Sequence, residues 1–179
     1  MEEVRFHGRG GQGAVTAAMI LSVAAFKDGK YTQAFPKFGV ERRGAPVEAY
    51  TRISDSFIRR KSQVYNPDYL VVLDSTLFGA VNITDGFNPE GMIIVNTNKS
   101  AKELGLSKYN VKILDVSKLA MDVLGRDIVN TAMLGAFGGF TGKVSLKSLL
   151  AGVEEQFSGG IRDKNKKLVE EVYNQSKGK

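Results

Sequence analysis

Six residues near the start of the chain, GRGGQG at positions 8–13, constrain the fold more than any other feature. The apolar run Val4–Phe6 before them predicts a strand. The longer apolar stretch after them predicts a helix from Gly13 or Ala14 to about Phe26. Glycines permit a tight turn and a close approach to the backbone, and a helix N-terminus favours an anion. The segment therefore predicts a strand–turn–helix unit that suits a phosphate or another chain.

The glycine loop matches the letters G-x-G-x-x-G, which are typical of dinucleotide-binding proteins. That pattern also expects an acidic residue about 20 positions further on, at the end of the second strand. The predicted second strand, Tyr31–Phe35, is followed by Pro36 and Lys37 and offers no acid. Three interpretations stay open: a dinucleotide, another phosphate-bearing ligand or partner chain, and a turn without a ligand. The candidate binding residues of this loop are Gly8, Arg9, Gly10, Gly11, Gln12 and Gly13.

A second loop, between Pro36 and Pro46, is rich in glycine, proline and charge. Its middle places Glu41 before Arg42 and Arg43. A guanidinium group suits a carboxylate or a phosphate, and Glu41 can hold one of them in position. These three residues form a second candidate binding group, and an exposed charged loop is the alternative.

The remaining pattern predicts an α/β protein. Alternation over Val47–Ile53 predicts a half-buried strand, followed by a hairpin partner at Phe57–Arg60. Ser75 is expected to cap a short helix. Continuously apolar segments predict strands covered on both faces at Asp68–Asp74, Met92–Asn96 and Val111–Val116. Further helices are expected over residues 117–124, 128–137, 146–157 and 163–175, with a break at GAFGGFTG (135–142).

We therefore expect a single domain over residues 1–179, with its C-terminal helices beginning at about 145. Its class is a three-layer α/β/α sandwich around a mixed, mostly parallel, Rossmann-like sheet. Three polar residues at element ends are ambiguous. His7 is expected to have a packing or surface role, Asn130 to bond a loop, and Asp74 either to contact a ligand or to cap a helix.

The composition excludes several kinds of site. The chain contains no cysteine and one histidine, so by itself it forms no disulfide, cysteine-ligated cluster, zinc–thiolate site or multi-histidine metal site. Acids at Glu2 and Glu3 argue against a signal peptide, and the longest apolar stretch is too short to span a bilayer. We expect a cytoplasmic protein without a membrane partner. The net charge of +6 suits an acidic partner or a solvated surface, and no basic run with interleaved aromatics supports nucleic-acid binding.

Four segments in order carry a resemblance to a known family. They are GRGGQG at 8–13, ERRGAPVEAYTRIS at 41–54, NPDYLVVLD at 66–74 and NTAMLGAF at 130–137. Together they resemble the gamma subunits of the 2-oxoacid:ferredoxin oxidoreductases, with the greatest likeness to the pyruvate branch. The resemblance covers nearly the whole chain, and residues 140–179 add little.

The resemblance implies an accessory subunit of a complex that decarboxylates a 2-oxoacid, passes electrons to ferredoxin and forms acyl-coenzyme A. Thiamine diphosphate, Mg²⁺ and [4Fe–4S] clusters would belong to the alpha, beta and delta subunits. This chain would help to assemble the complex and to enclose the coenzyme A site through its two loops, with no catalytic residue of its own. An isolated chain is expected to self-associate through surface meant for partners. The alternative is a stand-alone nucleotide-binding module or oxidoreductase that uses the GRGGQG loop.

Overall fold

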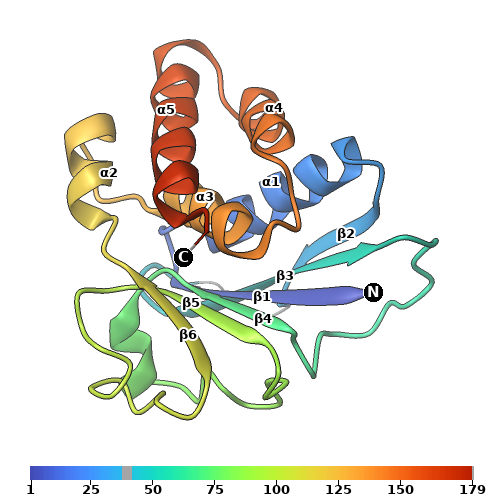
Figure 1. Cartoon of the computed structure of the whole chain (residues 1–179), viewed down its shortest axis with the longest axis vertical. Coiled ribbons are helices and arrows are strands. Elements are labelled where there is room, and N and C mark those ends of the chain that lie inside the picture. The colour runs from blue at the N-terminus through green and yellow to red at the C-terminus, as the bar shows by residue number, and fades with distance from the viewer. Residues whose placement is uncertain (38–41, 179) are drawn as a thin grey trace.

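The fold is a six-stranded sheet with helices packed mainly on one face (Figure 1). A computed structural model describes residues 1–37 and 42–178. Its strands are β1 Glu2–Arg9, β2 Tyr31–Pro36, β3 Pro46–Ser54, β4 Tyr69–Val72, β5 Met92–Asn96 and β6 Asn110–Leu114. Its helices are α1 Ala14–Lys27, the 3₁₀ helix η1 Ser75–Gly79, α2 Ser117–Leu124, α3 Asn130–Thr141, α4 Leu146–Gln156 and α5 Gly159–Ser176. None of the helices in the described ranges is long and apolar enough to cross a membrane.

The sheet is mixed, with the strand order β2-β3-β1-β4-β5-β6. The pairs β1–β4, β4–β5 and β5–β6 are parallel, whereas β1–β3 and β2–β3 are antiparallel. After β1 the chain passes through α1 to β2, at one edge of the sheet. After β4 it continues to β5, in the direction of the other edge. The connections that follow β1 and β4 therefore lead toward opposite edges of the sheet. The adjacent carboxyl ends of these two strands form a switch point, where ligands bind in open α/β sheets. The expected α/β class with a mixed, mostly parallel sheet is confirmed.

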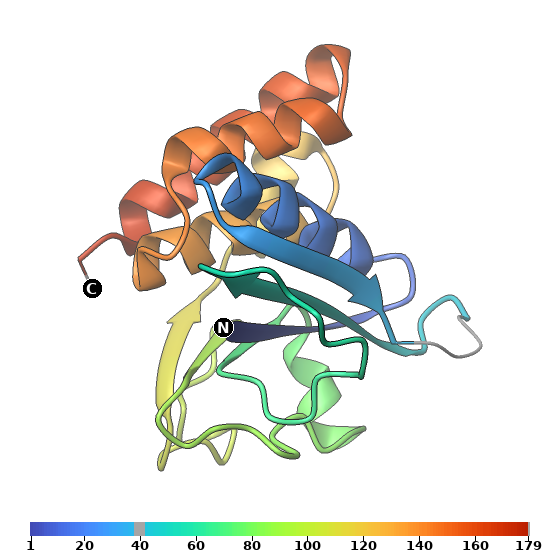
Figure 2. The same cartoon turned by 90° about the vertical axis from the view of Figure 1, so that its right-hand side faces the viewer.

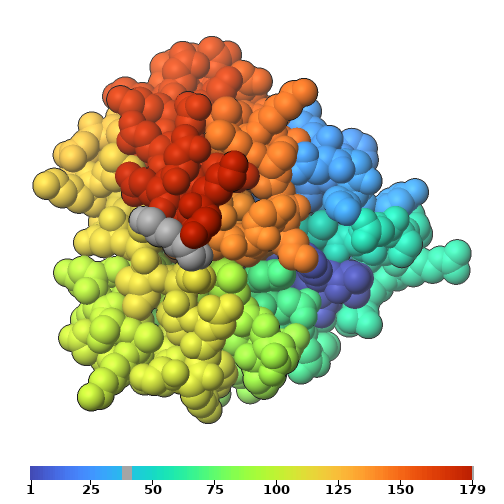
Figure 3. Space-filling model, in the orientation of Figure 1, coloured from blue at the N-terminus to red at the C-terminus, as the bar shows by residue number. Residues whose placement is uncertain are grey.

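The helical face of the sheet is covered directly by α1 and α3, and α4 and α5 pack on these two helices farther from the strands (Figures 1 and 2). With side chains drawn, these helices form one continuous layer above the strands and loops drawn in yellow and green (Figure 3). Small residues let α1 approach the sheet closely, because Ala17, Ala18, Ala24 and Ala25 are buried. A large apolar core, including Phe6 of β1, lies between this layer and the sheet.

The predicted break at 135–142 is wrong, because α3 continues without interruption to Thr141, with Gly142 as its C-cap. The glycines of this segment face α5. A Cβ on Gly135 would lie 2.5 Å from the Val169 carbonyl oxygen, and one on Gly139 would lie 2.6 Å from that of Tyr173. Glycine costs about 1 kcal/mol in a helix interior. Here the missing side chain lets the backbones of α3 and α5 approach each other. Helix propensity therefore predicted a break where the glycines form a buried packing face.

The opposite face is covered by η1 and by loops instead of long helices, so the third layer is thinner than a sandwich of α-helices. A second apolar cluster lies there, around Leu70, Ile93 and Phe87. The predicted hairpin strand at Phe57–Arg60 is absent: these residues are irregular. A side chain, and not a strand ladder, holds this segment to the sheet. Arg52 donates to the carbonyl oxygens of Arg60 and Ser62 at 3.3 and 2.7 Å.

The expectation that β3 is half-buried is also wrong for residues 49–54, because both faces of the strand are covered there. Arg52 is 0% exposed, and it forms a 2.7 Å ion pair with Glu3. On β1 the neighbouring Arg5 donates to the carbonyl oxygens of Ile83 and Asp85, both at 2.7 Å. Two buried arginines thus attach surface loops to the sheet.

His7 lies in the same buried network, so of the two expected roles, packing or surface, the structure shows packing. It is 2% exposed, and its Nε2 accepts a 3.0 Å hydrogen bond from Arg5 Nε. Burial, followed by the charge of Arg5, lowers the pKa of His7 to about 3. The imidazole is therefore neutral at physiological pH.

Candidate functional site

The candidate site lies at the carboxyl ends of β1 and β4, where the glycine loop turns from β1 into α1. Gly11 and Gly13 have φ values of 97° and 80°, in the left-handed region that favours glycine. Gly11 is exposed, and no atom lies within 4 Å of the position its Cβ would take. The loop therefore needs glycine at these positions for its backbone path.

Gly10 answers a different need, because this chain's own second loop packs against it. A Cβ on Gly10 would lie 2.3 Å from the Arg42 carbonyl oxygen. Gly10 N donates to the Ala45 carbonyl oxygen at 2.9 Å, and Gly44 N donates to the Gly10 carbonyl oxygen at 3.0 Å. The space that this second glycine of G-x-G-x-x-G leaves for a pyrophosphate is thus taken by the Arg42 backbone. This contact argues against the dinucleotide interpretation.

Gly13 is approached by α3, since a Cβ there would lie 2.4 Å from Asn130 Nδ2. Asn130 is 4% exposed and donates a long hydrogen bond of 3.4 Å to the Gly13 carbonyl oxygen. The expectation that Asn130 bonds a loop is confirmed. The glycine loop is therefore packed between α3 and the second loop.

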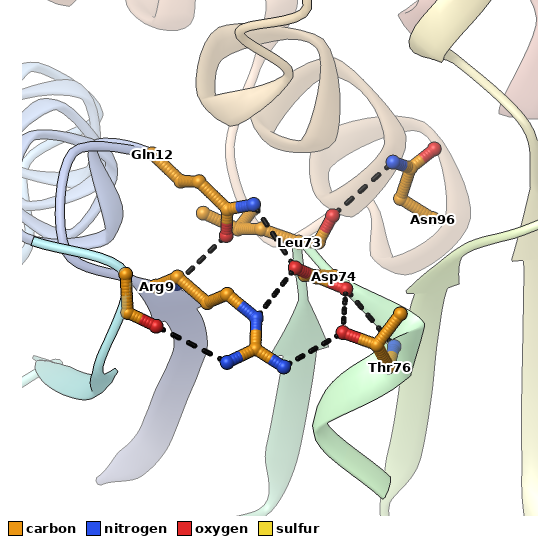
Figure 4. Close-up of polar contacts among 7 residues, drawn as sticks. Arg9, Gln12, Leu73, Asp74, Thr76 and Asn96 are labelled. Carbon is orange, nitrogen blue, oxygen red and sulfur yellow. Dashed lines mark hydrogen bonds and ion pairs between the residues drawn. The ribbon is translucent and has the colours of Figure 1, made fainter.

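Arg9, at the end of β1, is held by the protein on every side of its guanidinium group (Figure 4). Its Nε pairs with Asp74 Oδ2 at 3.0 Å, its Nη1 donates to the Gly44 carbonyl oxygen at 3.1 Å, and its Nη2 donates to Thr76 Oγ1 at 2.8 Å. One side chain thus joins β1, the second loop and the start of η1. This arrangement fixes the shape of the site.

Gln12 and Asp74 complete the same network (Figure 4). Gln12 Oε1 accepts from Arg9 N at 2.7 Å, and its Nε2 donates to Asp74 Oδ2 at 3.1 Å. Asp74 also caps η1 by accepting from Thr76 N at 2.9 Å. The predicted cap at Ser75 is therefore wrong by one residue, and the capping alternative for Asp74 is confirmed.

The carboxyl group of Asp74 is ionised at neutral pH. Burial by itself would raise its pKa, but hydrogen bonds from Thr76 and Gln12 and the charge of Arg9 lower it below its ordinary value. Asp74 thus holds three groups from different elements in one place. Sequence patterns identified Asp74 as an element end but not as the centre of this network.

A polar cavity of about 350 Å³ opens beside Asp74, along the carboxyl ends of the parallel strands. Asn96 fixes its wall: its Nδ2 donates to the Leu73 carbonyl oxygen at 3.1 Å, and its Oδ1 accepts from Val116 N at 3.0 Å. Asn96 was not predicted as a site residue, although a polar residue at the end of a buried strand was the available signal. The described lining is Gln12, Leu73, Asp74, Ser75, Asn96, Thr97, Asn98, Asp115, Ser117, Asp127 and Val129. It includes three aspartates and no lysine or arginine, so it disfavours a phosphate.

Arg42 and Arg43 of the second loop do not line this cavity. Arg42 and Arg43 are exposed, and Gly10 forms a parallel bridge with Arg43. The predicted Glu41 lies outside the described residues. The structure thus brings the two sequence-predicted loops together, with Arg9 holding their backbones and the two exposed arginines at their rim. Among the described residues, no group of three or more His, Cys, Asp or Glu side chains is placed to hold a metal ion.

Comparison with known proteins places this geometry in a family. The chain matches the family described as pyruvate ferredoxin/flavodoxin oxidoreductase over residues 3–175. The pyruvate synthase subunit PorC of Methanocaldococcus jannaschii is 53% identical over 175 residues, which cover 98% of this chain and 97% of that protein. The pyruvate/ketoisovalerate oxidoreductases common subunit gamma of Thermococcus kodakarensis is 53% identical over 181 residues, with 98% and 97% covered.

Solved structures give the same relation. The crystal structure of pyruvate oxidoreductase subunit PORC from Thermotoga maritima superposes with a TM-score of 0.83 at 37% identity, over 97% of this chain and 95% of that one. A 2-oxoglutarate:ferredoxin oxidoreductase from Magnetococcus marinus shares the fold, with a TM-score of 0.80 at 15% identity, over 98% of this chain and 31% of that one. The four sequence segments, the fold and the matches over nearly the full length agree, and the chain belongs to the pyruvate ferredoxin/flavodoxin oxidoreductase family.

Proposed function

We propose that this chain is the gamma subunit of a pyruvate synthase, a complex that oxidatively decarboxylates pyruvate to acetyl-coenzyme A and reduces ferredoxin. The observation that carries the proposal is 53% identity to a pyruvate synthase subunit over nearly the full length of both chains. The chain lacks cysteine and therefore cannot ligate an iron–sulfur cluster by thiolates. In this proposal the clusters, thiamine diphosphate and Mg²⁺ belong to alpha, beta and delta subunits in the cytoplasm.

Isolation of the complex tests this assignment. A tagged copy of the chain, purified from cells that naturally contain it, should bring down proteins with a thiamine-binding motif and ferredoxin-type cysteine runs. The purified assembly should reduce ferredoxin when pyruvate and coenzyme A are added. Recovery of the chain without such proteins would overturn the accessory-subunit assignment.

Selection of the 2-oxoacid is assigned to other subunits. The Thermococcus kodakarensis relative is named as a subunit common to pyruvate and ketoisovalerate oxidoreductases. A subunit shared by two enzymes with different substrates cannot be what distinguishes them. By analogy, we place the substrate preference of the present complex outside this chain.

We further propose that the two loops enclose the phosphate-bearing end of coenzyme A through Arg42 and Arg43. Arg9 already donates to Asp74, Gly44 and Thr76, so its role here is to hold the loops together. Arg42 and Arg43 are exposed on the loop that contacts Gly10. Guanidinium groups bind phosphate strongly, whereas the aspartate-lined cavity repels it. These contrasts favour the rim of the second loop over the cavity.

Kinetics of the reconstituted complex test this role. Removing both side chains in an Arg42→Ala/Arg43→Ala variant should raise the KM for coenzyme A by about 10- to 100-fold, because charged hydrogen bonds contribute about 1.5–3 kcal/mol. The KM for pyruvate should not change. Arg59→Ala is the matched control, since Arg59 is also exposed but lies on a different segment. An unchanged KM for coenzyme A in the double variant would refute the role of the second loop.

A further inference from the structure

The outer edge of β2 offers unpaired backbone groups. β2 lies at the end of the strand order and bonds β3 along one edge. The bond from Lys37 N to the Glu48 carbonyl oxygen sets the alternation of this antiparallel ladder. Counting back along the register, Phe35, Gln33 and Tyr31 bond β3, whereas the N–H and C=O groups of Thr32 and Ala34 point outward. A second strand can therefore pair with this edge.

This edge lacks the features that usually prevent strand addition. Natural edge strands carry charges, prolines or bulges that block pairing. Residues 31–35, with the sequence YTQAF, are uncharged, and proline appears at the last strand position, Pro36. No described strand covers the outer side, and Figure 2 shows β2 running along the margin of the sheet beneath α1.

Apolar side chains flank the open edge on both faces of the sheet. On the helical face, Met19, Val23 and Phe26 follow one side of α1 at helical spacing, and Met19 and Phe26 are 49% and 68% exposed. A groove between α1 and β2 includes Val23, Phe26 and Thr32. On the other face, the exposed rings of Tyr31 and Phe57 pack edge to face with centroids 6.1 Å apart. Exposed apolar groups in such a cluster mark an interaction surface.

The spacing of α1 and β2 suits a second copy of this chain as the occupant. α1 packs on both β2 and β3. Neighbouring strands lie about 4.8 Å apart. If β2 pairs with β2 of a second copy, the two α1 helices lie about two strand spacings apart, close to 10 Å. Packed helices lie about 8–10 Å apart, so the Met19–Phe26 stripes of the two copies would meet at ordinary packing distance.

The charges around the edge do not oppose this arrangement. Lys27, Lys30 and Lys37 lie near the ends of α1 and β2, where two-fold symmetry would bring lysines of both copies close together. Each is already paired within the chain: with Glu155 at 2.6 Å, with Asp55 at 2.5 Å and with Glu48 at 2.9 Å, respectively. These ion pairs neutralise the repulsion that a net charge of +6 would otherwise concentrate there.

We propose that two copies of this chain form a two-fold symmetric dimer by antiparallel pairing of β2 with β2. Gln33 lies at the axis, so Thr32 of one copy bonds Ala34 of the other, and the α1 helices face each other across the joined sheets. The pairing is isologous, because the same surface serves both copies. The inference does not depend on the proposed function.

Sedimentation velocity of the full chain tests the dimer. The protein concentration should run from about 1 to about 100 µM, which is on the order of typical subunit affinities. Met19→Glu places charges on the stripe and should convert the dimer to monomer, weakening association by about 100-fold or more. Met121→Glu is the matched control, because Met121 is also a helical methionine with 49% exposure but lies on α2. A monomeric wild type at the highest concentration, or equal effects of both substitutions, would overturn the proposal.

Hydrogen exchange of individual amides distinguishes strand pairing from association of helices alone. In the dimer the amides of Thr32 and Ala34 should become protected as protein concentration rises, and Met19→Glu should remove that protection. The amides of Gln33 and Phe35 bond β3 and should stay protected in both proteins, which gives an internal control. A dimer in which Thr32 and Ala34 exchange freely would refute pairing through β2.

Discussion

The two faces of the sheet are covered by different chemistry. On the helical face, alanines of α1 and glycines of α3 allow close apolar packing between backbones. On the opposite face, Arg5 and Arg52 reach from the sheet to the carbonyl oxygens of loops. Helices satisfy their own backbone groups, whereas loops need partners for theirs. The comparison indicates that buried arginine replaces helical hydrogen bonding where the covering layer is irregular.

Removing one arginine should have the largest effect on this comparison. We expect Arg52→Met to lower the free energy of unfolding by about 3–5 kcal/mol, because it leaves several loop carbonyls without their donor and the Glu3 carboxylate with only the exposed Arg60, at 3.6 Å. Urea denaturation measures this loss. The double variant Glu3→Gln/Arg52→Met should recover part of it, since the unpaired charge is gone. A loss below about 1 kcal/mol would show that arginine does not hold this face.

Acidification should weaken the same face through His7. The pKa of His7 is about 3 in the folded protein and about 6.5 in the unfolded chain, so the unfolded state binds the extra proton between these values. Stability should therefore fall as pH falls below about 6.5, by up to about 1.4 kcal/mol per pH unit. The measurement is chemical denaturation between about pH 7 and pH 5.5, a window that lies above the ordinary pKa values of Asp and Glu, about 3.9 and 4.3.

His7→Gln provides the control for that slope, because glutamine keeps an acceptor for Arg5 but does not titrate. Its stability should be nearly independent of pH in this window. The carboxyl groups of Asp28, Glu48 and Asp74 have lowered pKa values in the fold, so their contributions are lost at lower pH. Since the chain has one histidine, an equal slope in the variant would exclude His7 as its cause.

On the helical face, a single methyl group should separate α3 from α5. Gly135→Ala places a carbon 2.5 Å from the Val169 carbonyl oxygen, and neither backbone can yield without moving its helix. We expect a loss of about 1–3 kcal/mol despite the better helix propensity of alanine. Thermal or urea unfolding measures it. An unchanged or raised stability would mean that α3 and α5 do not pack through glycine.

The smallest effect should have the opposite sign. Gly160 lies in α5, and no atom lies within 4 Å of the position of its Cβ. Gly160→Ala should therefore raise stability by about 0.5–1 kcal/mol through helix propensity and reduced freedom of the unfolded chain. The same unfolding assay measures both glycines. A destabilised Gly160→Ala would show that the loss at Gly135 does not report packing alone.

Much of the fold was predictable from local pattern. Periodicity identified α1, and continuous apolar runs identified β4 and β5, because burial on both faces leaves a strong signal. The run at Val111–Val116 also identified a strand, β6, but this strand lies at the sheet edge and is only partly buried. The polar face of β3 was misjudged as solvated, since alternation cannot distinguish water from a covering loop held by Arg52. The continuation of α3 from residue 137 to Thr141 was missed because propensity does not include the approach of α5.

The candidate site was predictable in its parts but not in its assembly. The glycine loop and the ERRGAP loop were both identified from composition, yet their contact depends on tertiary structure that no local pattern encodes. Arg9 shows the difference most clearly. Its charge suggested a ligand contact, but its neighbours in the fold are Asp74 and Thr76, which come from a distant part of the chain.

The contact at Gly10 limits how sequences of this kind can drift over evolution. Its Cβ position meets the main-chain carbonyl of Arg42, which every amino acid possesses. No exchange of side chains in the second loop can therefore compensate for an alanine at position 10. The contact at Gly13 is with the side chain of Asn130, so a smaller residue at position 130 would relieve the clash. At Gly13 the positive φ angle would then be the remaining reason for glycine. A lineage that keeps the two loops joined thus has no substitution open at Gly10.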